Sequence, residues 1–178
     1  VEMDVNYLLI ISTSAGLWSY NIGDTIKFTS IDPYRIIVSG RIKHFLSAFG
    51  EHVISEEVEK AMEAATKLHN VAIREFTVAP NINPIDMLPH HEWYIEFENF
   101  PEDMSAFTKS LDNEMINQNI YYKDLIDGKI LKSLEVISVE RGGFNNYMKS
   151  VGRLGGQNKV PRLSNDRKIA DKLKTINS

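Results

Sequence analysis

The sequence predicts an α+β fold, in which a mostly antiparallel sheet with flanking helices is preceded by a β meander from the end of a larger domain. Short β-rich runs separated by turn formers fill residues 1–38, and after Gly40 the apolar period becomes that of a helix. Strands and helices then alternate to the end of the chain. We therefore place the domain boundary between Ser39 and Gly40, with residues 1–39 in one unit and 40–178 in the other.

The first unit is predicted to be an antiparallel meander, because β-rich runs alternate with turn formers. The runs are Tyr7–Ser12, Leu17–Tyr20, Thr25–Ile31 and Arg35–Val38. The predicted turns fall at Ser14–Gly16, Asn21–Asp24 and Asp32–Pro33.

The second unit opens with a predicted helix over Glu56–Lys67, because Val58, Met62 and Ala65 recur at helical spacing behind Ser55, a favourable N-cap residue. Later helices are predicted behind Asp103 or Ser105 to Ile116, at 121–126, at 143–150, and behind Ser164 or Asn165 to Ile176. Strands are predicted at 71–78, 93–97 and 130–139. This order predicts a sheet covered by helices.

Composition limits the classes of function. The chain of 178 residues is 43% hydrophobic, enough for a packed core, and has no run of the ~18 apolar residues that a membrane span needs. Its net charge of -4 argues against a general nucleic-acid binder, and its first residues lack the pattern of a signal peptide, so a cytoplasmic location is the default. The absence of cysteine excludes disulfides, thiolate metal sites and a cysteine nucleophile.

Basic residues gather in the last segment, from Arg141 to Lys174, where only Asp166 and Asp171 oppose them. Two interpretations stay open. The segment is either a solvated basic face of a helix or a surface that meets an anionic ligand such as a nucleotide.

A Gly-Asp pair, Gly23 and Asp24, lies between two predicted strands. In a tight turn these are often no more than turn residues. A carboxylate at the end of a strand can also accept hydrogen bonds from both hydroxyls of a ribose, and charged acceptors bind strongly. Asp24 is therefore either a turn residue or a nucleotide ligand.

The domain boundary offers a hinge at Ser39, Gly40 and Arg41, because glycine adopts dihedral angles that other residues avoid. A plain bend between strand and loop, with Arg41 in solvent, explains the same residues. The local sequence does not decide between the two.

The run from Gly152 to Arg162 is rich in glycine but is no P-loop. Lys159 does not follow a glycine, and Val160 stands where a hydroxyl residue would bind magnesium. The run is either a glycine-rich surface turn or a flexible loop that presents Lys159 as a movable cation beside the rigid Pro161.

The histidines do not predict a metal site, because His90 and His91 are adjacent and no H-E-x-x-H motif is present. The aromatic residues that follow are expected to pack on both faces of a sheet, because side chains alternate along a strand. They are Trp93, Tyr94, Phe97 and Phe100.

These patterns occur in an order that resembles the auxin-responsive acyl-acid amido synthetase family, in the carboxy-terminal portion of a bacterial-type member. Gly16–Ile26 is similar to the family's G-L-[YW]-R-Y-x-x-G-D motif, with Ser19 at the position of its arginine, and Gly40–Glu51 resembles the interdomain crossover. Later blocks are similar at Phe76–Pro80, His91–Trp93 and Gly155–Arg162. The resemblance covers nearly the whole chain.

The resemblance implies a ligase of the adenylate-forming superfamily, which uses ATP and magnesium to activate a carboxylic acid and then joins the acyl group to the amine of an amino acid. Residues 1–39 would be the terminal strands of its large domain, and residues 40–178 a lid that moves between the two half-reactions. The implied partners are an amino-terminal adenylation domain, a carboxylic acid and an amino acid, with no nucleic acid and no membrane. The chain alone is expected to be inactive.

The resemblance also implies roles for single residues. Asp24 would hold the ribose hydroxyls of ATP, Arg41 would lie in the hinge (Ser39–Arg41) and approach the nucleotide, and Lys159 would be the catalytic lysine at the α-phosphate. A carboxylate that attacks an anionic phosphate meets like-charge repulsion, which a positioned ammonium relieves. The alternative is a noncatalytic α+β module that binds a ligand or a protein.

Overall fold

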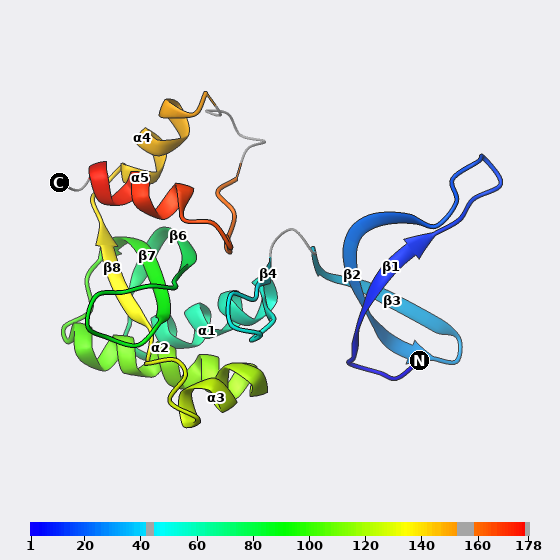
Figure 1. The fold of residues 1–178 in the computed structure, drawn as a ribbon, viewed down its shortest axis with the longest axis horizontal. Helices are drawn as coiled ribbons and strands as arrows, with labels where there is room; N and C mark the ends of the chain where they lie inside the picture. The colour runs from blue at the N-terminus through cyan, green and yellow to red at the C-terminus, as the bar shows by residue number, and fades with distance from the viewer. Residues whose placement is uncertain (42–44, 153–158, 177–178) are drawn as a thin grey trace.

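The chain forms a meander and a larger α+β unit (Figure 1). A computed structural model describes the backbone of residues 1–41, 45–152 and 159–176. The meander consists of β1 (Asn6–Ile11), β2 (Tyr20–Ile31) and β3 (Tyr34–Arg41), which pair antiparallel in that order, as predicted.

A β-bulge replaces one of the turns predicted in the meander. The run Leu17–Tyr20 forms no strand of its own, because β2 begins at Tyr20. The predicted turn at Asn21–Asp24 lies inside β2, where the register against β1 shifts. Gly23 has a φ of 81°, and its N–H donates to Asn21 Oδ1 at 2.8 Å. Glycine is needed here for a bulge in a continuous strand, not for a turn between two strands.

The α+β unit is built on a three-stranded sheet in the order β6-β7-β8. β6 (Ala72–Asn81) pairs antiparallel with β7 (His90–Asn99), and β8 (Glu135–Val139) pairs with β7 in parallel. The parallel pair needs a long crossover, which the helices between β7 and β8 supply. A short hairpin, β4 (Phe45–Leu46) and β5 (Val53–Ile54), precedes the first helix. The predicted α+β fold is confirmed, with one parallel pair among its described strands.

Helices cover both faces of this sheet (Figure 1). Those on one face are α1 (Ser55–Leu68), α2 (Met104–Gln118) and α3 (Ile120–Asp127), and those on the other are α4 (Gly143–Ser150) and α5 (Lys168–Ile176). Asp103 caps α2 as predicted, by accepting the Ala106 N–H at 3.0 Å. Asn165 does not cap α5 but accepts the Ser47 N–H at 3.0 Å, and the helix begins later. Among the described ranges, no helix has both the length and the apolar character that crossing a bilayer requires.

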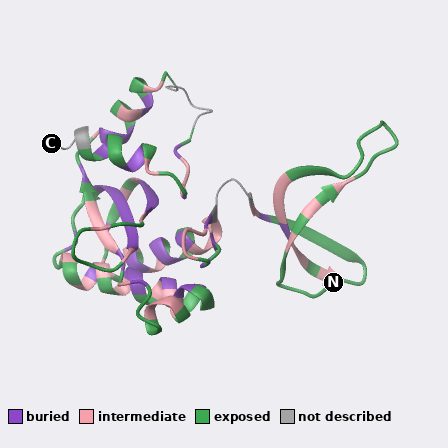
Figure 2. Ribbon diagram, viewed as in Figure 1, coloured by how far each residue is buried: buried purple, intermediate pink, exposed green. Residues whose placement is uncertain are grey.

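Alternation along β7 divides the core into two layers. Trp93, Ile95 and Phe97 pack with α1 and α2, whereas Tyr94 packs with α4 and α5. Figure 2 shows the buried strand between the two layers of helices. Phe100 was expected in the core but is 61% exposed, because it lies beyond the end of β7.

A buried carboxylate on β7 attaches α5 to the sheet. Glu92 is 2% exposed and accepts hydrogen bonds from Arg167 Nη2 at 2.6 Å, Lys174 Nζ at 3.0 Å, Tyr94 Oη at 2.7 Å and Asn81 Nδ2 at 3.0 Å. Burial alone would raise the pKa of Glu92, but the hydrogen bonds from Tyr94, Arg167 and Lys174 outweigh it and lower the pKa to about 2.

We predict that Glu92→Gln lowers the free energy of unfolding at neutral pH by up to about 3 kcal/mol, the equivalent of the pKa shift. A carboxylate whose folded pKa lies below its unfolded value of 4.5 stabilises the fold above that pH, and the stabilisation is lost as the pH falls toward 2. The variant should therefore lose less stability than the wild type between about pH 5 and pH 2.

Chemical denaturation across this pH range measures the effect. The control is Glu98→Gln on the same strand, because the Glu98 side chain is 49% exposed and its ion pair with Arg74 should matter little. An identical pH dependence in the wild type and Glu92→Gln would show that the Glu92 ion pairs do not stabilise the fold.

Candidate functional site

Asp24 and Arg41, the two predicted nucleotide ligands, lie opposite each other in the meander. They are paired residues of β2 and β3, although the side chain of Arg41 falls outside the described part of the structure. Asp24 is half-buried and follows directly after the bulge at Gly23. Bulges re-aim the side chains beside them and are frequent next to binding sites. The structure therefore brings the backbone of both residues side by side at the end of β3.

The predicted hinge residues lie at the end of β3. Ser39 is buried, and its hydroxyl donates to Asn6 Oδ1 at 2.6 Å and lies 3.1 Å from Thr25 Oγ1. Gly40 pairs with Thr25 in the sheet, and an added Cβ would lie 3.2 Å from Thr25 Oγ1. The φ of Gly40 lies outside the left-handed region, so this conformation does not itself require a glycine for its dihedral angles. Close approach of two strands explains it instead.

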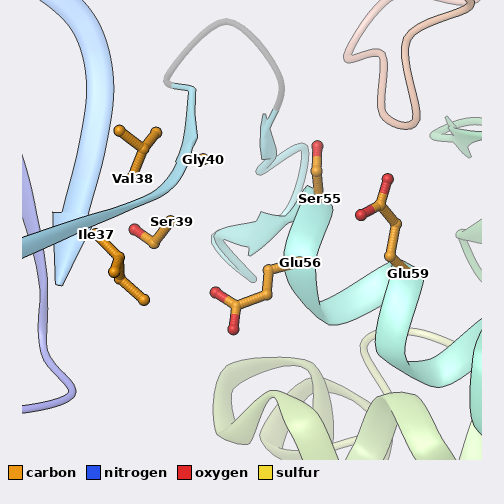
Figure 3. Close-up of a pocket in the computed structure, with 7 residues that line it drawn as sticks. All are labelled: Ile37, Val38, Ser39, Gly40, Ser55, Glu56 and Glu59. Carbon is orange, nitrogen blue, oxygen red and sulfur yellow. The ribbon is translucent and has the colours of Figure 1, made fainter. Parts of the chain in front are cut away.

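A cavity of about 460 Å³ separates the end of β3 from the start of α1 (Figure 3). Its walls are Ile37, Val38, Ser39 and Gly40 on one side and Ser55, Glu56 and Glu59 on the other. Beside it, Lys27 Nζ of β2 forms an ion pair with Glu56 Oε2 at 3.2 Å. The boundary between the two units is therefore lined by the predicted hinge and by the first turns of α1.

Lys159 is exposed and borders two further cavities. One, of about 250 Å³, is lined by Ser55 and Glu59 of α1 and by residues 159–162. The other, of about 220 Å³, lies between the sheet and α4 and includes the buried Glu96. Ser55 and Glu59 also line the boundary cavity. Lys159 and the hinge residues thus share the start of α1 as a common wall.

The chain that follows Lys159 is attached to the free edge of β6. The Val78 N–H donates to the Arg162 carbonyl at 2.9 Å, and the Ser164 N–H donates to the Val78 carbonyl at 3.1 Å. Thr77 Oγ1 donates to the Pro161 carbonyl at 2.7 Å. Residues 153–158 of the predicted flexible loop lie outside the described residues, so its flexibility stays a prediction.

Arg162 contacts two other elements from this segment. Its Nε lies 3.2 Å from Glu59 Oε1 on α1, and its Nη1 pairs with the Glu75 carboxylate and donates to the Phe76 carbonyl at 3.1 Å on β6. The guanidinium also lies over the Phe76 ring, 4.5 Å from its centroid. Sequence analysis missed this arrangement because Glu59 and Glu75 lie 103 and 87 residues away, and no local pattern predicts such pairs.

Three other basic residues of the last segment also form ion pairs. Arg167 and Lys174 bind Glu92, and Lys168 binds Asp166. Arg167 and Lys174 therefore attach α5 to the sheet, a role that neither the solvated-face nor the ligand-binding interpretation of this segment predicted.

Three potential metal ligands converge at one end of the sheet. They are His90, Glu92 and Glu135. Glu92 already accepts four hydrogen bonds, two of them from Arg167 and Lys174, and Glu135 is paired with Lys132. A cation would have to displace these basic side chains, so we assign no metal ligand to this group.

Comparisons with known families and proteins agree with this architecture. The model of the GH3 family C-terminal domain matches residues 56–168, and that of the GH3 family central domain matches residues 1–41. The chain is 27% identical over 180 residues to the indole-3-acetic acid-amido synthetase GH3.4 of Arabidopsis thaliana, an alignment that covers 91% of this chain and 29% of that protein.

Two solved structures share the fold. The GH3.15 acyl acid amido synthetase has a TM-score of 0.74 at 20% identity over 98% of this chain and 34% of its own. The AtGH3.15 acyl acid amido synthetase in complex with 2,4-DB has a TM-score of 0.73 at 21% identity over 98% and 33%. The chain therefore spans about a third of the length of these proteins. Since the first family model matches more than half of it, the chain belongs to the GH3 family and carries the C-terminal domain of that family.

Proposed function

We propose that the chain is the carboxy-terminal part of an ATP-dependent acyl-acid amido synthetase, which joins a carboxylic acid to the amine of an amino acid through an acyl-adenylate. One structural observation supports the proposal in addition to family membership. Lys159 is exposed on a cavity that shares two wall residues, Ser55 and Glu59, with the cavity at the domain boundary. A lysine placed there is suited to a nucleotide held between this domain and an amino-terminal adenylation domain.

In the proposed first half-reaction, the carboxylate oxygen of the acid attacks the α-phosphorus of ATP, and pyrophosphate leaves. Both reacting groups are anions, so their approach is opposed by repulsion. The Lys159 ammonium would contact both and stabilise the negative charge that develops on the phosphate oxygens. In the second half-reaction the amine attacks the acyl carbon and AMP leaves, and the same lysine is no longer required at the phosphate.

Asp24 and Arg41 would bind the nucleotide from the meander. The Asp24 carboxylate would accept hydrogen bonds from the ribose hydroxyls, and Arg41 would approach from the opposing residue of β3. Magnesium would accompany the triphosphate, with its protein ligands in the amino-terminal domain. We expect the enzyme to act in the cytoplasm without nucleic acid or a membrane as partner.

We propose that the lid turns at Ser39–Arg41. Ser39 and Gly40 are held to the meander by Asn6 and Thr25, and would therefore form the fixed base of the hinge. Arg41, as the last residue of β3, would then be the first to change its dihedral angles.

We predict that Lys159→Ala in the intact protein slows adenylate formation by roughly 100- to 1,000-fold, the usual cost of removing one preorganised contact to the transition state. The measurement compares acid plus ATP with preformed acyl-adenylate plus amine. Lys168→Ala is the control, because the Lys168 side chain is 85% exposed on the same basic segment.

The two rates separate the possible roles of Lys159. A loss confined to the first half-reaction supports the proposal. Equal loss in both would indicate misfolding or a general binding role. Unchanged rates would contradict the proposal and favour the noncatalytic binding module.

We predict that Asp24→Ala acts on nucleotide binding, because it removes a charged acceptor of the ribose hydroxyls. Lost hydrogen bonds to a charged group cost about 1.5 to 3 kcal/mol, so the KM for ATP should rise by roughly 10- to 100-fold. Steady-state kinetics at varied ATP concentration measure this KM. Asp24→Asn, assayed in the same way, keeps the shape of the side chain and removes its charge. A KM equal to that of the wild type would exclude Asp24 as a ribose ligand.

A further inference from the structure

The side chains of Arg162 and Thr77 add to the backbone bonds that attach the segment after Lys159 to β6. Arg162 is 30% exposed and joins Glu59 of α1 to Glu75 of β6, with the Phe76 ring beneath its guanidinium. Thr77 binds the carbonyl of Pro161, two residues after Lys159. Both contacts lie on the same short stretch of chain.

We propose that Arg162 is a positioning residue that fixes Lys159 for adenylate formation, with Thr77 as a second anchor. This inference rests on the proposed role of Lys159. Arg162 would not touch the substrates, because its donors are turned to Glu59, Glu75 and the Phe76 carbonyl. It would act by fixing the backbone from which Lys159 extends.

The chemistry of arginine explains why a lysine could not replace it. A guanidinium directs several donors in one plane and stacks by its face on an aromatic ring, which matches the two carboxylates and Phe76. An ammonium at this position would keep the charge but lose the stacking and at least one of these directed contacts. Arg162→Lys is therefore a geometric change at constant charge.

One ion-pair partner of Arg162, Glu59, also lines the cavities of the candidate site. Glu59 lines the boundary cavity and also the cavity that Lys159 borders. An ion pair from Glu59 to Arg162 therefore fixes the Lys159 segment relative to the wall that the two cavities share. A displacement of about 1 Å at a reacting group can cost roughly 100-fold in rate, so this attachment matters even though it lies outside the reacting atoms.

We predict that Arg162→Lys and Thr77→Val each slow adenylation by roughly 10- to 100-fold, with the KM for ATP little changed. Matched controls are Arg141→Lys, at an exposed arginine, and Thr108→Val, whose hydroxyl donates to the Met104 carbonyl inside α2. Hydrogen exchange of the Ser164 amide, which is bonded to Val78, should quicken in Arg162→Lys and not in Arg141→Lys.

A double-mutant cycle with Lys159→Ala in the intact protein tests whether Arg162 acts through Lys159. If Arg162 acts through Lys159, Arg162→Lys should slow the wild type but cause no further loss in Lys159→Ala. The same loss in both backgrounds, or no loss in the wild type, would overturn the positioning role while leaving the role of Lys159 intact. An unchanged adenylation rate in Lys159→Ala alone would instead overturn the proposed function on which the inference rests.

Discussion

Strand β7 is buried on both faces along His90–Phe97, and much of the α+β unit is arranged around the polar side chains that this strand carries. A buried polar group without a partner is costly, and three of these side chains are paired with distant segments. His91 lies 3.0 Å from Glu51 in the segment before α1, and Glu92 binds Arg167, just before α5, and Lys174 within it. Glu96 accepts backbone N–H groups at the start of α4. These contacts hold the peripheral elements against the sheet.

This arrangement also determines where the proposed catalytic residue can lie. With β8 along one side of β7, the opposite edge of the sheet is β6, and residues 162–164 bind there through Val78. Lys159 is thereby placed near α1, whose first turn faces the meander across the boundary cavity. In the proposed synthetase, this domain would carry Lys159 on the side that faces the nucleotide.

Periodicity predicted the described helices because this signal is local, and Asp103 caps α2 as expected. The cap predicted at Ser55 was wrong, because Ser55 is the first residue of α1 and the N-cap is Ile54. Contacts in the folded chain account for the elements that differ from the sequence prediction. The strand expected from Ile130 begins only at Glu135, and the preceding Leu131 and Leu134 pack in the core outside any strand. Gly23 forms a bulge instead of a turn, and the partners of Arg162 are remote in sequence. The roles of Asp24, Arg41 and Lys159 came from the family resemblance, and the structure adds their surroundings.

Exchange of labelled pyrophosphate into ATP by the intact protein is the most direct test of the central claim, that this domain serves an acyl-adenylating synthetase. The assay reports adenylate formation without any acceptor amine, so it does not depend on the amino acid used. We predict exchange that requires magnesium and appears only with certain members of a panel of aliphatic, aryl and indole carboxylic acids. A folded protein that binds ATP but exchanges no pyrophosphate with any of these acids would contradict the account.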